Sequence, residues 1–271
     1  MTGAGTGGRP RRRWVWALVA LATVTVFAVP FRLRFIAPKH GMQHAVDPRV
    51  NYRRGISDLQ VQANGGTVVT IRAGLPDQVT VSGFLSWALG KPTITQSWHG
   101  GTLHVGATCP KFDPFGGCQV MLVVSVPAGT AVQAQAGAGS MTVTGLSGPV
   151  HLTGTSGILV ARDDSGPVWA TVTSGSVVAR SGLTSQHFYA SATSGQIALA
   201  FSAGPRTVSV GLGSGSADIT VPAGSRYRIV RSLGSGLLNV APGLSDAGSD
   251  LVLTATVGSG VARIGYPAGP G

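Results

Sequence analysis

Carboxylates are scarce in this chain of 271 residues, which contains nine aspartates and no glutamate. Enzymes that cleave polysaccharides use two carboxylates that flank the scissile bond, whereas Asp163 and Asp164 are adjacent in a segment typical of a turn. The six histidines, at positions 40, 44, 99, 104, 151 and 187, show no metal-ligand spacing. We therefore expect no catalytic residue, no metal site and no cofactor.

Cysteine is also rare, with only Cys109 and Cys118, in the segment ATCPKFDPFGGCQV. A structural zinc site would need two further ligands. If this part of the chain is exported, it meets an oxidising compartment, and closing so short a loop contributes about 2.5 to 3 kcal/mol on the chain-entropy model. The pattern therefore favours a disulfide between Cys109 and Cys118 over a metal site.

Helix-favouring glutamate is absent, while glycine, serine, threonine, valine and alanine dominate the composition, and glycine alone accounts for 41 residues. Glycine and β-branched residues are poor in helix interiors, and short strands joined by tight turns accommodate them. The composition predicts an all-β protein.

One long apolar run is present, WVWALVALATVTVFAVPF at residues 14–31. As a helix its 18 residues would reach roughly 27 Å, close to the ~30 Å core of a bilayer. Residues 1–39 carry seven basic and no acidic side chains, which is most of the net charge of +11. We expect a basic cytoplasmic tail at 1–13, a single-pass signal anchor that contacts the lipid bilayer through 14–31, and an extracellular remainder. A cleaved signal peptide is the alternative, although no Ala-x-Ala motif follows the run.

The basic charge gives no reason to expect a nucleic-acid partner, because it flanks the apolar run and no nucleic-acid-binding motif occurs.

Small-residue corners centred on glycine recur every 18 to 24 residues in the second half of the chain. They are Gly139, Gly157, Gly175, Gly195, Gly215, Gly236 and Gly260. Residues two and four positions after each glycine are apolar, as Val177 and Ile197 illustrate, and residues seven before it are also apolar. A period near twenty with this alternation predicts a β-solenoid of two-strand coils over residues 136–271, with Val177 and Ile197 as buried lateral neighbours. The glycines are expected to occupy tight reversals at positive φ.

The earlier part of the chain is less regular. Residues 51–135 contain short alternating segments, and we expect them to form a β region that carries the cysteine loop and caps the solenoid. Residues 32–50 are expected to be a linker, and FLSWALGKP at 84–92 favours a loop or short helix.

Two outward columns are candidate ligand sites. Six positions before three successive corner glycines stand His151, Trp169 and Tyr189, which in-register coils would stack about 4.8 Å apart. Aromatic faces can bind sugars, but the arrangement favours rings that stabilise the sheet by packing on each other. Arg162 and Arg180, five after the glycine, would form a cationic column for an anion, unless solvent or the nearby aspartates screen it.

These motifs together resemble a known family. The residues that carry the resemblance are Cys109, Cys118, VPAGTAV at 126–132 and MTVTGLSGPVHLTGTSG at 141–157. Over about residues 50–265, the chain resembles the bacterial putative-adhesin family of β-strand-repeat domains. The resemblance implies a β-solenoid ectodomain behind one membrane span, and it supplies no catalytic motif.

We therefore expect a membrane-anchored, extracellular, non-enzymatic β-solenoid that acts as an adhesin-like binding or scaffolding protein of the bacterial cell envelope. Envelope glycans or anionic wall polymers are its candidate partners, and the oligomeric state is left open. An accessory or sensory component of an envelope-stress response is the alternative, and an enzyme acting on cell-wall polysaccharide is a third reading.

Overall fold

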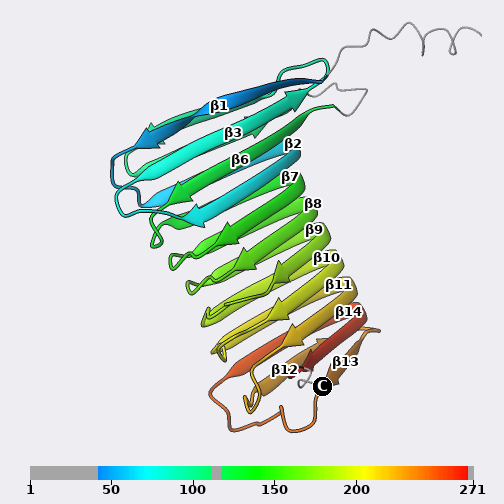
Figure 1. Ribbon diagram of the computed structural model, residues 1–271. Coiled ribbons are helices and arrows are strands. Elements are labelled where there is room, and N and C mark those ends of the chain that lie inside the picture. The colour runs from blue at the N-terminus through cyan, green and yellow to red at the C-terminus, as the bar shows by residue number, and fades with distance from the viewer. Residues whose placement is uncertain (1–41, 111–116, 268–271) are drawn as a thin grey trace, which may run out of the picture. The chain divides into compact units, whose positions relative to one another are not determined.

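A computed structural model describes residues 42–110 and 117–267, which form an all-β structure without a helix (Figure 1). The strands are β1 (Gln43–Tyr52), β2 (Asp58–Ala73), β3 (Val79–Trp87), β4 (Thr93–His99), β5 (Thr102–Thr108), β6 (Gln119–Val126), β7 (Ala131–Thr144), β8 (Val150–Arg162), β9 (Val168–Ala179), β10 (His187–Ala200), β11 (Thr207–Thr220), β12 (Arg228–Leu233), β13 (Leu237–Val240) and β14 (Val252–Gly265). All of them belong to one hydrogen-bonded system, which confirms the predicted all-β class.

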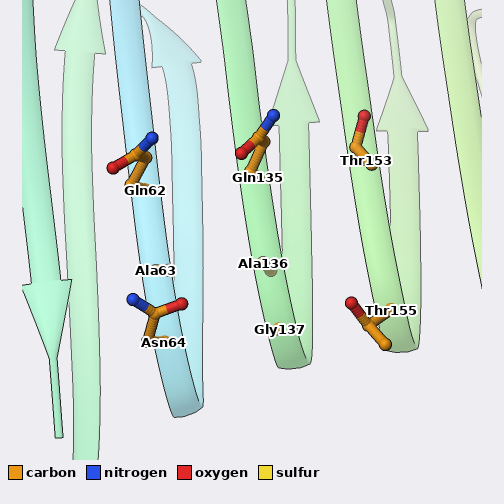
Figure 2. Close-up of a pocket in the computed structure, with 8 residues that line it drawn as sticks. All are labelled: Gln62, Ala63, Asn64, Gln135, Ala136, Gly137, Thr153 and Thr155. Atoms are coloured by element: carbon orange, nitrogen blue, oxygen red, sulfur yellow. The ribbon is translucent and has the colours of Figure 1, made fainter.

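The long elements turn back on themselves, so that their two halves lie in two layers. Figure 2 shows this reversal for β2, β7 and β8. In β8, Val150 and Leu152 are buried before the corner and Leu159 and Ala161 after it, so the alternation changes phase at the corner. Both halves therefore direct apolar side chains into one core between the layers. We call the layer of first halves the front layer and the layer of second halves the back layer.

Neighbouring elements pair in parallel and residue for residue. The order β7, β8, β9, β10, β11, β14 runs through the sheet without a register shift (Figure 1). Val177 lies opposite Leu159 on one side and Ile197 on the other, and these side chains are 2%, 3% and 1% exposed. The predicted lateral pairing of Val177 with Ile197 is confirmed.

The corners explain why glycine recurs. Positive φ is found at six of the seven predicted glycines, namely Gly139, Gly157, Gly175, Gly195, Gly215 and Gly260. At Gly195 φ is 148°, and a Cβ there would overlap the carbonyl oxygen of Gly175 in the adjacent element. The prediction of a tight reversal at positive φ is thus confirmed for these six, whereas Gly236 does not have a positive φ.

The N-terminal end is closed by antiparallel strands and a disulfide. β5 pairs with the front half of β2, and β6 pairs with its back half. The predicted disulfide between Cys109 and Cys118 joins the end of β5 to the start of β6 and is confirmed. β4 then pairs antiparallel with β5, β3 with β6, and β1 with β3.

Two local predictions in this region were wrong. Residues 43–50, expected to be linker, form most of β1, which pairs with β3 through Val46 and Phe84. The register shifts between Asp47 and Val50, where Pro48 lies, and such an irregularity accommodates a proline in a strand. Residues 84–87, expected to be a loop or short helix, end β3, where Leu85 and Trp87 are buried.

The order of the last elements also differs from the expected sequential stacking. β14 lies between β11 and the pair β12 and β13, although it follows them in the chain (Figure 1). Arg231 of β12 lies opposite the fully buried Ala255 of β14, at a position where other elements carry a buried apolar residue. A guanidinium is tolerated there only at the end of the stack, where Arg231 is exposed.

The predicted cytoplasmic tail at 1–13, the span at 14–31 and linker residues 32–41 lie outside the described residues. Among the residues that are described, no helix has the length and apolar character needed to cross a membrane.

Candidate functional site

The outer surface of the front layer is uncharged over most of its length. The front halves of β7, β8, β9, β10, β11 and β14 contain no aspartate, lysine or arginine. Their outward residues are mainly threonine, serine, glutamine and glycine, with a few aromatic side chains. Charged residues occur in the back layer instead, as Arg72, Asp218 and Arg263 show. The front face is therefore chemically distinct from the back layer.

The predicted aromatic column forms on this front face. The ring of Trp169 lies 4.2 Å from that of His151 and 5.4 Å from that of Tyr189, both with interplanar angles of 3°. This face-to-face stacking follows from the in-register pairing of β8, β9 and β10. Because Trp169 is covered on both sides, its ring faces are occupied by its neighbours rather than open to a sugar. The stack stabilises the sheet, and only the outer faces of His151 and Tyr189 remain for a ligand.

The two candidate arginines do not belong to the same face as these rings. Arg162 ends the back half of β8, and Arg180 directly follows the back half of β9. The five candidate residues therefore do not form one ligand face, because the corner glycines place the halves of each element on opposite sides of the core. Both arginines are exposed, and the single ion pair among the described residues is Arg263 with Asp218 at 3.7 Å.

The adjacent carboxylates of Asp163 and Asp164 lie in different surroundings. Asp163 is exposed, whereas Asp164 is fully buried at the corner between β8 and β9. The Leu146 N–H donates to Asp164 Oδ1 at 2.7 Å, while Oδ2 has no partner among the described residues. Burial raises the pKa of Asp164 to about 6, and the backbone hydrogen bonds only partly oppose this. The two carboxylates therefore cannot flank one substrate.

Raising the pH from about 3.5 to about 7 is expected to destabilise the protein by roughly 2 to 3 kcal/mol relative to Asp164→Asn. Below pH 3.8, the usual pKa of an aspartate, Asp164 is protonated in both the folded and the unfolded protein. Between pH 3.8 and about 6, Asp164 loses its proton in the unfolded chain but retains it in the folded protein. Stability contributed by the protonated group is thus lost as the pH rises through this window. Urea unfolding of both proteins at each pH measures the difference, and a difference that does not change with pH would contradict the prediction.

Beside the aromatic column, the front face contains a shallow hollow of about 380 Å³ (Figure 2). Gln62 and Asn64 of β2, Gln135 of β7, and Thr153 and Thr155 of β8 line it. In Figure 2, Gly137 lies between Asn64 and Thr155, and because it has no side chain the surface is open at this point. None of these five polar side chains has a hydrogen-bond partner within the described residues.

A second, smaller hollow of about 170 Å³ lies on the same face. It is lined by Thr95 and Ser97 of β4, His104 of β5, and Gln60 and Gln62 of β2. Gln62 lines both hollows, so together they cross the adjacent strands β4, β5, β2, β7 and β8. Neither hollow contains an aspartate, lysine or arginine.

Sequence reasoning did not identify this pair of hollows. Gln62 and Gln135 are 73 positions apart in the sequence, and they become neighbours only because β2 pairs with β7. The one available signal was the outward placement of Gln60, Gln62 and Asn64 in an alternating strand. Within residues 42–110 and 117–267, no group of three or more histidine, cysteine or acidic side chains is placed to hold a metal ion.

Comparisons with known proteins find only loose structural likeness. No family model matches the chain, and no curated protein matches it. A solved putative cell adhesion protein from Clostridium sporogenes is 11% identical with a TM-score of 0.40, covering 83% of this chain and 100% of that one. A putative adhesin from Bacteroides fragilis is 11% identical with a TM-score of 0.34, covering 84% and 98%. A putative lipid binding protein from Parabacteroides distasonis is 13% identical with a TM-score of 0.36, covering 83% and 97%. Scores this low do not establish a shared fold.

Proposed function

We propose that this protein is a membrane-anchored, extracellular β-solenoid that acts as a non-enzymatic, adhesin-like binding or scaffolding module of the bacterial cell envelope. The observation that carries the proposal is the uncharged front face, which extends over β7, β8, β9, β10, β11 and β14, whereas the back layer carries charged residues. A regular face of hydroxyl and amide groups suits an extended polymer, because the same groups recur at each strand spacing of about 4.8 Å.

The solenoid interpretation is supported by the parallel, in-register pairing and by the shared core of the two layers. The anchor and the extracellular location are supported by the apolar run at 14–31 and its basic flanks. Binding is favoured over catalysis because Asp164 is buried and cannot act together with Asp163 on a bound sugar.

Placing negative charge on the front face is expected to abolish binding to isolated bacterial cell walls. The test variant is Thr171→Glu with Ser191→Glu, which places carboxylates at adjacent front positions of β9 and β10. Co-sedimentation of the full-length protein in detergent micelles should fall at least about tenfold, since an unpaired carboxylate must be desolvated at the contact.

The matched control is Ser176→Glu with Gln196→Glu, a pair of adjacent back-layer positions on the same two elements. It introduces the same charge and should leave wall binding unchanged. Equal loss of binding in both variants, or no wall binding by the natural protein, would contradict the proposal, and thermal unfolding of each variant verifies that the fold is retained.

A further inference from the structure

We infer that the two hollows of the front face bind a neutral, linear oligosaccharide that lies across β4, β5, β2, β7 and β8. This inference rests on the proposed binding function and deepens it, because it places the site at one end of the front face and chooses neutral glycan over anionic polymer. The linings of the two hollows contain none of the stacked residues His151, Trp169 and Tyr189.

The side chains that line the hollows have the chemistry of sugar recognition. A carboxamide donates through its NH₂ and accepts through its oxygen, so Gln62, Asn64 and Gln135 can each engage neighbouring hydroxyl groups. Thr153 and Thr155 add hydroxyls that both donate and accept. Because none of these groups has a partner within the described residues, a ligand would gain hydrogen bonds without breaking any in the protein.

The absence of charged side chains from both linings selects the class of ligand. A phosphate-rich polymer would require lysine or arginine, which offer charge-assisted hydrogen bonds, and neither residue lines either hollow. An apolar ligand is disfavoured because amide and hydroxyl groups would have to be desolvated without a partner. An uncharged ligand with many hydroxyl groups needs no cationic side chain and can form hydrogen bonds with the amide and hydroxyl groups of the hollows.

The shape of the site favours a chain over a single sugar. Gln62 lines both hollows, which makes them continuous, and five adjacent strands cover four spacings, or about 19 Å. His104 lies in the smaller hollow and His151 stands two residues before Thr153, so imidazole rings are present near both ends of the site. A short oligosaccharide therefore matches the site better than a monosaccharide does.

Gly137 provides a selective way to close the larger hollow. A Cβ built there meets no atom closer than 3.9 Å, and its backbone does not have a positive φ, so a side chain is accommodated without strain. Gly137→Leu therefore fills the hollow while it retains every polar group. Gln196→Leu is the matched control, because it places the same side chain on the back half of β10, outside both hollows and away from the front face.

The experiment is calorimetric titration of the full-length protein in detergent micelles with β-1,4-linked N-acetylglucosamine tetramer, mannose tetramer and poly(glycerol phosphate). At least one neutral tetramer should bind with a Kd of about 1 mM or lower, as expected for a shallow polar site. Gly137→Leu should weaken that binding at least about tenfold, Gln196→Leu should leave it unchanged, and poly(glycerol phosphate) should not compete.

The inference is overturned if neither tetramer binds, if Gly137→Leu binds as the natural protein does, or if the anionic polymer displaces the sugar. Cell-wall binding that persists unchanged in Gly137→Leu would overturn this site and leave the proposed function standing. Tetramer binding that Gly137→Leu abolishes, in a protein that does not bind cell walls, would support the site and refute the proposed function.

Discussion

Gly195→Ala is expected to unfold the protein at room temperature. Gly195 has a φ of 148°, where any residue with a Cβ is strained, and its Cβ would overlap the carbonyl oxygen of Gly175. The obstructing atom belongs to the backbone of the adjacent element, so relief requires the register of β9 and β10 to change. The cost should exceed about 4 kcal/mol, and circular dichroism with thermal unfolding measures it.

Gly137→Ala is the control for this prediction. The new Cβ meets nothing closer than 3.9 Å, and φ at this glycine is not positive. Its effect on stability should remain within about 0.5 kcal/mol. If both variants were equally stable, the corner geometry described for Gly195 would be incorrect.

Val177→Asp is expected to have a comparably large effect, through the core rather than the backbone. Val177 is 2% exposed and lies between Leu159 and Ile197, which are apolar and buried. A carboxylate at this position has no cation or hydrogen-bond donor from those side chains, so it must be neutralised or the structure must open. We expect a loss of more than about 4 kcal/mol, measured by urea unfolding.

Ser176→Asp introduces the same carboxylate one position earlier, where the strand directs the side chain to the outer surface of the back layer. The midpoint of unfolding should change little. An unchanged midpoint in Val177→Asp would show that β9 does not face the core as described.

The repeating part of the fold could be predicted because each element satisfies the same two local requirements. Glycine must stand at the corner, and residues such as Val177 and Val208 must alternate toward the core. Both requirements leave a direct signal in the sequence at a nearly constant spacing. The aromatic stack of His151, Trp169 and Tyr189 was predictable for the same reason.

The ends of the sheet could not be predicted from that spacing. The sequence pattern identifies which residues face the core. It does not specify which strands pair with each other when they are far apart in the sequence. β2 pairs with β5, β6 and β7, and its partner residues lie between 44 and 73 positions away in the sequence. Arg231 was the one visible sign that its element belongs at an end.

The candidate site was predicted only in part. The aromatic column forms as predicted, but the aromatic residues and the arginines lie on opposite layers because each corner reverses the chain. The hollows depend on a missing side chain at Gly137 and on the irregular register between Ala63 and Gly66, where β2 meets β7. Neither feature has a recognisable pattern in a single sequence.

The insertion of β14 between β11 and β12 has a consequence for biogenesis. Within the described residues, β12 and β13 make their strand pairs with β14 alone, so they have no lateral partner until residues 252–265 have left the ribosome. Vectorial growth of the sheet, one element after another, can therefore proceed through β11, whereas β12 and β13 can pair only after β14 has been made. β14, the last strand to be made, therefore joins β12 and β13 to the rest of the sheet.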